Sequence, residues 1–283
     1  MHFHFPFTII EILWTLTFAA QLVLLVVLLG RERLRCFPWF TASIVILALR
    51  ALAARVLFHR VPELTFSTIF ITLADVGMLL GLLVLAEMAR IGFRGVRRAT
   101  WIATTVVTLA IAGGVMAYWG AWPAWKQLTA NSRLAALMLM QLAAQKGQLL
   151  LGVLSIELGV LVLLFGRRYH AGWRTHVQRI VIGLSTAALA ELTVSGVWEI
   201  IVKHVVPKSR EQYEHILDLR DKITNANSAV YLLVLIWWIA ILWMDEPGAA
   251  RSAQALPPVK KDFIETPTDS IATTEASPGP QSS

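Results

Sequence analysis

The sequence predicts an all-α polytopic membrane protein: a seven-transmembrane helix bundle with its N-terminus outside the cytoplasm and its C-terminus inside. Composition, seven apolar segments and the placement of arginine and tryptophan support this class. Hydrophobic residues make up 57% of the 283 residues and charged residues 15%, whereas a soluble domain has roughly a quarter of its residues charged. The mean hydropathy is +0.64. This composition is typical of a protein embedded in a bilayer.

Seven apolar segments are long enough to cross a hydrocarbon core of about 30 Å at about 1.5 Å per residue. They lie at residues 8–30, 37–57, 66–89, 99–120, 147–166, 178–202 and 225–244. They form a predicted transmembrane domain over residues 1–244. Because no basic region precedes the first segment and no small-residue cleavage site follows it, we expect this segment to remain in the mature protein.

Arginines at the segment ends predict the orientation. The connections after the first, third and fifth segments are rich in arginine. They contain Arg31, Arg33 and Arg35; Arg90, Arg94, Arg97 and Arg98; and Arg167, Arg168, Arg174 and Arg179. Such loops belong in the cytoplasm. Tryptophans, which prefer the headgroup level, mark both faces: Trp39, Trp101, Trp173 and Trp243 on the cytoplasmic side, and Trp119, Trp122, Trp125 and Trp198 on the external side. The external loop at 203–224 is the exception, because it interleaves basic and acidic residues.

Two external regions show helical patterns of their own. A pattern from Asn131 to Phe165 exceeds the membrane thickness, so the fifth helix either projects outward or breaks near Gly147. In the loop at 203–224, Ser209 and Gln212 have capping-box spacing, and an apolar stripe follows. That pattern predicts a separate short amphipathic helix on the external face.

The segment at 245–283 is rich in proline, serine, threonine, alanine and acidic residues. Such a composition buries too little apolar surface to fold. We expect a disordered cytoplasmic tail.

Charged residues within the apolar segments are the candidate functional residues. Each costs at least about 2.5 to 3.5 kcal/mol near a bilayer centre unless it is paired or hydrated. The set comprises Glu11, Arg50, Arg55, Asp75, Glu157, Glu191 and Glu199. Most of them fall in the outer half of the predicted bundle. We expect a polar, acid-lined cavity there that binds a ligand, an ion or a proton.

Two pairings are expected within this set. Arg50 should pair with Asp75 or Glu191, and Arg55 with Glu11 or Glu199. The alternative is that these residues are structural ion pairs that set the helix register. For Arg50 and Arg55, the sequence is compatible with both a functional cavity and structural ion pairs.

Glu157 and Glu191 have no evident cation at their depth, which favours a functional role. Glu87, by contrast, is spaced to form an interfacial pair with Arg90.

Small residues indicate which helices pack closely. Gly77 and Gly81 form a GxxxG step, and Gly183 and Gly196 lie in a segment rich in alanine and serine. Small residues let helix backbones approach each other in a bilayer. These two segments are predicted to be central.

Catalytic and cofactor motifs are not evident. The histidines are scattered without metal-ligand spacing, so no cofactor or metal is predicted. Residues 225–244 contain no lysine, unlike the last helix of microbial rhodopsins, and Gly183-Leu184-Ser185-Thr186 departs from the G-x-S-G motif of rhomboid proteases. The single cysteine, Cys36, excludes an intramolecular disulfide. Despite a net charge of +7, the arginines form no single basic face, which argues against nucleic acid as a partner.

Three function classes remain. The first is a non-enzymatic sensor or accessory subunit whose partners are the lipid bilayer, another membrane or output protein, and a small ligand or cation. The second is a small-solute or proton-coupled transporter that uses its intramembrane carboxylates. An intramembrane enzyme without a recognisable motif ranks third. The arginine pattern favours the cell membrane, specifically a bacterial inner membrane.

Overall fold

A computed structural model of the chain describes residues 8–57, 60–94, 96–119, 122, 133–165, 175–204 and 209–244. Its elements are α1 (Ile9–Gly30), η1 (Arg33–Arg35), α2 (Pro38–Leu57), α3 (Glu63–Gly92), α4 (Arg98–Tyr118), α6 (Arg133–Phe165), α7 (His176–His204) and α8 (Arg210–Trp243). In this part of the chain seven helices are long and apolar enough to cross a membrane. The all-helical class with seven such helices is confirmed, and it is consistent with an integral membrane protein. The predicted tail at 245–283 lies outside the described residues.

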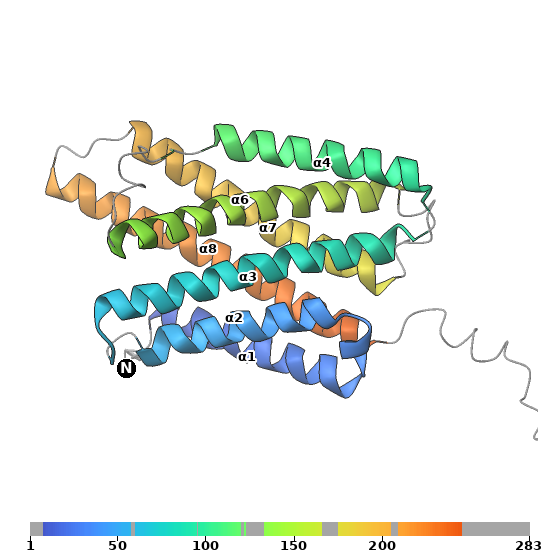
Figure 1. The fold of residues 1–283 in the computed structure, drawn as a ribbon. Helices are drawn as coiled ribbons and strands as arrows, with labels where there is room; N and C mark the ends of the chain where they lie inside the picture. The colour runs from blue at the N-terminus through green and yellow to red at the C-terminus, as the bar shows by residue number, and fades with distance from the viewer. Residues whose placement is uncertain are drawn as a thin grey trace, which may run out of the picture. The chain divides into compact units, whose positions relative to one another are not determined.

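Successive long helices run in opposite directions (Figure 1), so each bundle end collects alternate connections. At the end where α1 finishes and α2 begins, the described residues include Arg31, Arg33, Arg90, Arg94 and Arg97. We call this the arginine end and the other the opposite end. The arginine clusters therefore gather on one side of the bundle, as alternating helices require.

Six helices form a closed ring. In the order α1, α2, α3, α6, α7 and α8, each packs against the next, and α8 packs against α1. The backbone of α4 comes close only to that of α6 among the described helices. Ala112 is the buried residue of α4, while Gly113 and Gly114 have no atom within 4 Å of an added Cβ. Hence α4 lies outside the ring.

Glycines allow close packing between ring helices. The four positions singled out from the sequence each face a side chain from another segment: Gly77 faces Ile46, Gly81 faces Leu151, Gly183 faces Trp238 and Gly196 faces Trp119. A Cβ on Gly81 would lie 2.6 Å from Leu151 Cδ2. A side chain there would force its neighbour to move, which is why only glycine fits without rearrangement.

The apolar core lies in the half of the ring nearest the arginine end. Leu28, Phe40, Met88 and Ile180 are at most 1% exposed. Beside them, the Trp238 ring meets Phe40 edge-on at a centroid distance of 5.1 Å. Large apolar side chains thus fill this half of the bundle.

The structure settles the two alternatives for the fifth span. α6 runs without a break from Arg133 to Phe165. Gly147 does not interrupt it, because this glycine accommodates Met78, whose Cε lies 2.7 Å from the position of an added Cβ. Its 33 residues extend about 50 Å, well beyond a hydrocarbon core of about 30 Å.

The prediction of a separate amphipathic helix before the last span is wrong. Ser209 does cap a helix, accepting a hydrogen bond from the Gln212 amide at 3.2 Å. That helix is α8 itself, which continues to Trp243. No proline or glycine occurs between Arg210 and Trp243 to end it. The predicted helix is instead the polar first part of one continuous helix.

Candidate functional site

A set of mostly polar side chains lies at one level of the ring, one from each of its six helices. We call it the polar layer, and it consists of Gln21 on α1, Arg50 on α2, Phe70 on α3, Gln148 on α6, Glu191 on α7 and Tyr231 on α8. Because the helices alternate in direction, residues far apart in sequence reach the same level of the bundle. The layer lies on the opposite-end side of the apolar core.

Glu191 is the centre of the polar layer. Gln148 Nε2 donates to both of its carboxylate oxygens at 3.4 Å. The Arg50 guanidinium and the Glu191 carboxylate attract each other electrostatically without a direct ion pair, and the neutral Tyr231 phenol lies near the same carboxylate. Of the two partners expected for Arg50, Glu191 is therefore the one with which it interacts. One carboxylate connects side chains from α2, α6, α7 and α8.

Phe70 and Gln21, the two remaining members of the polar layer, contact Arg50 and Tyr231. The Arg50 guanidinium carbon lies 4.4 Å from the centroid of the Phe70 ring, which is cation–π geometry. Gln21 is 3% exposed, and its Nε2 donates to Tyr231 Oη at 3.5 Å. These contacts add α1 and α3 to the set of helices joined through Glu191.

Beside the polar layer, a cavity of about 780 Å³ lies between α6 and α7. We call it the α6–α7 cavity. It reaches from Glu191 in the middle of α7 to Lys203 near the end of that helix. Its wall combines charged, amide and aromatic side chains, among them Trp119, Lys146, Gln148, Glu191, Trp198 and Glu199. The cavity is accordingly amphipathic and extends toward the opposite end.

The other charges of the α6–α7 cavity have partners. Glu199 pairs with Lys203 at 2.6 Å. Lys146 is 9% exposed and donates from Nζ to the Trp119 carbonyl at 2.6 Å, and it lies over the Trp122 ring at 4.4 Å. A cation at the C-terminus of α4 also complements the helix dipole. Glu191 is consequently the carboxylate of this cavity with the weakest direct pairing, since both of its hydrogen bonds come from the Gln148 amide.

Comparisons with protein-family models, curated proteins and solved structures found no match for this chain. The side chains around Glu191 define the chemistry that the site offers. A carboxylate accepts hydrogen bonds and pairs with cations. Aromatic faces such as those of Trp119 and Trp198 also attract cations. The α6–α7 cavity thus suits a ligand that carries an ammonium group or other hydrogen-bond donors.

Three of the sequence-predicted residues lie elsewhere. Arg55 Nη2 is 3.8 Å from Glu11 Oε1, with the two side chains 65% and 40% exposed. Glu11 also completes the capping box of α1 with Thr8. Asp75 on α3 lines neither the α6–α7 cavity nor the cavity bounded by α3, α4 and α6, and its Oδ1 is buried without a hydrogen-bond partner among the described residues. The Arg55–Glu11 contact is one of the two pairings expected from the sequence.

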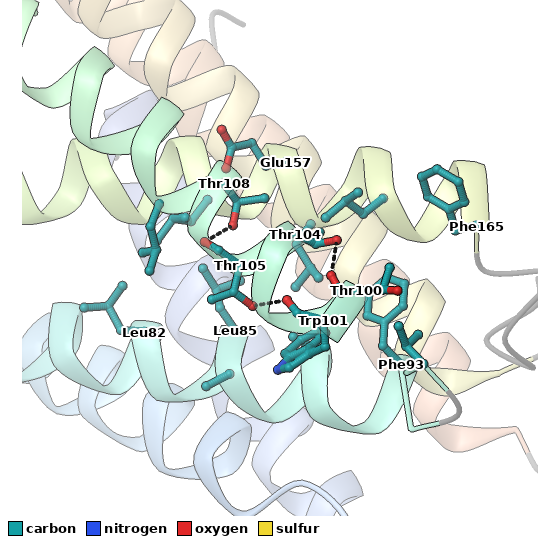
Figure 2. Close-up of a pocket in the computed structure, with 17 residues that line it drawn as sticks. Leu82, Leu85, Phe93, Thr100, Trp101, Thr104, Thr105, Thr108, Glu157 and Phe165 are labelled. Carbon is teal, nitrogen blue, oxygen red and sulfur yellow. Dashed lines mark hydrogen bonds between the residues drawn. The ribbon is translucent and has the colours of Figure 1, made fainter. Parts of the chain in front are cut away.

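Glu157 lines a second cavity, bounded by α3, α4 and α6 (Figure 2). It does not share the α6–α7 cavity with Glu191. The residues expected to form one cavity are therefore distributed over two cavities, the polar layer and the surface near the start of α1, and Asp75 lies in none of these. Hydropathy indicates the depth of each residue but not the direction in which its side chain points.

Glu87 has a different role from the expected pairing with Arg90. Its carboxylate accepts hydrogen bonds from the Phe40 amide at 3.2 Å and the Trp39 amide at 3.5 Å. These amides belong to the first turn of α2, which begins at Pro38. Glu87 thus caps α2 from α3, in the way a side chain satisfies the free N–H groups at a helix N-terminus.

Sequence reasoning missed Gln21, Gln148 and Tyr231. Each is a neutral polar residue inside an apolar segment, a weaker signal than a charge because such residues cost less to bury. Lys146 was also missed, because the sequence drew attention only to its neighbour Gly147, as a point where the fifth span could break. Its position within α6 and near the α4 C-terminus depends on how the helices pack.

Proposed function

We propose that the chain is a multi-pass protein of the cell membrane, in a bacterial inner membrane, with its arginine end in the cytoplasm. In this proposal it is a non-enzymatic sensor or accessory subunit. A small ligand with an ammonium group enters the α6–α7 cavity from outside the cell and pairs with Glu191. One observation carries the proposal: Glu191 lines the cavity and is also the centre of the polar layer.

The size and walls of the cavity support a small-molecule ligand. Its volume of about 780 Å³ falls within the range of about 300–1,000 Å³ typical of such pockets. Glu191 supplies the negative charge, and Trp119 supplies an aromatic face that favours a cation, whereas the Trp198 ring already has the Arg220 guanidinium carbon 5.4 Å from its centroid. Lys146 and Glu199 are engaged with groups of the protein itself, which leaves Glu191 for the ligand.

Ligand binding at Glu191 would change the interactions between helices on different sides of the ring. An ammonium group at Glu191 would compete with Arg50 for the same carboxylate, and the two residues belong to α7 and α2. A ligand shifts a conformational equilibrium when it binds one arrangement better than another. Weakening the Arg50–Glu191 interaction would favour a different arrangement of these helices, which a partner protein in the membrane or the cytoplasm then recognises.

A proton-coupled transporter is the second candidate. It is favoured by Glu157 and Asp75, whose buried carboxylate oxygens lack hydrogen-bond partners in the described part of the chain. Intramembrane acids of this kind mark proton relays and ion paths in membrane proteins.

The test uses the purified full chain in phospholipid nanodiscs with a panel of small primary and quaternary amines. For the sensor or accessory function, at least one amine should raise the melting temperature of the wild type, and Glu191→Gln should abolish the increase. Glu199→Gln is the matched control and should retain it. An increase that survives Glu191→Gln, or no increase with any amine, would contradict the proposed site.

Two further measurements separate the candidate functions. Affinity purification from native membranes should recover a stoichiometric partner if the protein is an accessory subunit. In liposomes that contain this protein alone, pH-dependent solute flux would instead establish the transporter.

A further inference from the structure

The second cavity lies between α3, α4 and α6 and has a volume of about 390 Å³. We call it the α3–α4–α6 cavity (Figure 2). It exists because the α4 backbone approaches α6 but not α3, so side chains alone border the gap between α3 and α4. Leucines from α3 and α6 form much of its wall, and aromatic residues lie toward the arginine end.

Glu157 is the single charged side chain among the described residues that line this cavity. Both of its carboxylate oxygens are buried, and neither has a hydrogen-bond partner within the described ranges. Figure 2 shows Glu157 at the Thr108 side of the cavity, whereas Phe93 and Phe165 lie toward the arginine end. The cavity therefore has one acidic end and a long apolar remainder.

The polar residues of the wall direct their hydroxyl groups elsewhere. Thr104, Thr105 and Thr108 each donate to a carbonyl of α4 itself, at 2.9, 2.9 and 3.0 Å. The indole nitrogen of Trp101 points away from Glu157 (Figure 2). Thr100 lies at the start of α4, two helical turns from Thr108. Among the described residues that line the cavity, none therefore offers Glu157 a donor, and an occupant of the cavity can supply one.

We propose that the α3–α4–α6 cavity binds an amphipathic amine, with its ammonium group on Glu157 and its alkyl chain against α3 and α4. A carboxylate in apolar surroundings is costly unless it is paired, and an ammonium group supplies both the charge and the donors. The apolar wall matches a hydrocarbon chain. The gap between α3 and α4 would give such a molecule a lateral route from the bilayer. This site is separate from the α6–α7 cavity and does not depend on it.

The experiment uses the full chain in phosphatidylcholine nanodiscs with a photoreactive alkylamine that carries a diazirine on its chain. Peptides are mapped by mass spectrometry after illumination. Labelling should be saturable and fall on the segments 82–93, 100–109 and 154–165. The alcohol of equal chain length should label these segments at least about tenfold less, because close charge pairs contribute a tenfold or larger factor in affinity.

Three variants identify the group responsible. Glu157→Gln should reduce amine labelling to the level of the alcohol. Asp75→Asn is the matched control, since Asp75 is a partly buried carboxyl on α3 that does not line the cavity, and it should leave the preference for amine intact. Ala86→Phe should abolish labelling by filling the cavity from a position where the side chain is exposed on its wall. This variant tests the site even where Glu157→Gln does not fold.

Three results would overturn the proposal. Equal labelling by amine and alcohol would show that the cavity holds only a lipid chain. A preference for amine that survives Glu157→Gln would assign the charge recognition to another residue. Labelling outside the three segments would place the amine at a different site.

Discussion

Gln148 Nε2 on α6 lies 3.4 Å from each carboxylate oxygen of Glu191 on α7. This contact holds the Glu191 carboxylate where it also interacts with Arg50 on α2. α2 and α7 are not neighbours in the ring. The carboxylate therefore couples helices that do not pack directly against each other.

Removing Arg50 should destabilise the protein through Glu191. Arg50→Met leaves a half-buried carboxylate without its cation, which should lower the free energy of unfolding by about 1–3 kcal/mol. Adding Glu191→Gln should restore most of this loss, because the unpaired charge is then gone. Unfolding by sodium dodecyl sulfate in mixed micelles measures all three proteins. Arg55→Met, which breaks the exposed pair with Glu11, should change the value by no more than about 1 kcal/mol. Additive effects of the Arg50 and Glu191 substitutions would show that the two residues are not coupled.

The cap that Glu87 provides should contribute measurably to stability. Glu87→Ala removes the acceptor of the Trp39 and Phe40 amides and should lower the free energy of unfolding by about 0.5–2 kcal/mol. Glu214→Ala is the comparison, because Glu214 forms an exposed pair with Arg210, and its loss should cost about 0.5 kcal/mol or less. Equal effects of the two substitutions would argue against a capping role.

Close packing at Gly183 should be sensitive to a single methyl group. Gly183→Ala places a Cβ against the indole of Trp238, and such overpacking typically costs about 1–3 kcal/mol. Gly113→Ala adds the same atom to α4, where nothing lies within 4 Å. It should be neutral or stabilising by up to about 1 kcal/mol, because alanine has the higher helix propensity. Thermal unfolding in detergent compares the two, and a tolerated Gly183→Ala would refute the close contact.

Lys146 should hold the end of α4 in place. Lys146→Met removes the hydrogen bonds to the Met116 and Trp119 carbonyls. Hydrogen exchange should then accelerate in the last turns of α4, since this helix packs its backbone against α6 only. Lys203→Met, on an exposed lysine of α7, is the control and should leave α4 exchange unchanged. Unaltered exchange in Lys146→Met would show that α4 is held by other contacts.

The orientation is tested with the natural cysteine. Cys36 is exposed at the arginine end, which we propose to be cytoplasmic. A membrane-impermeant maleimide should label it in inside-out vesicles and not in intact cells. In a Cys36→Ser background, Glu211→Cys at the start of α8 should show the reverse. Labelling of Cys36 from outside intact cells would invert the proposed topology.

The positions of the seven apolar helices followed from sequence, and most of their limits agree within a few residues. The two large differences concern α6 and α8. Hydropathy marks where a helix is apolar, but the helix ends where caps or breaking residues occur. The polar first part of α8 contains no such residue after Ser209, so the helix continues through it.

Fewer residues of the candidate site than of the helices could be predicted from the sequence. Glu191 stood out because a charge in an apolar segment is rare. Its amide partner Gln148 and the Gln21–Tyr231 contact did not, since neutral polar residues are common in such segments. The cap on α2 was also missed, because Glu87 and Phe40 come together only when α2 and α3 pack side by side.

The hydropathy of the segments and the arginine pattern by themselves determined the number of apolar helices and the side of the bundle on which the arginines gather. Only the tertiary structure decided that six helices close into a ring, that α4 lies outside it, and that Glu157 and Glu191 line different cavities. The physical reason is that hydropathy is a property of one segment taken alone. Which helices are neighbours depends on how small and large side chains fit between segments, as Gly183 and Trp238 do.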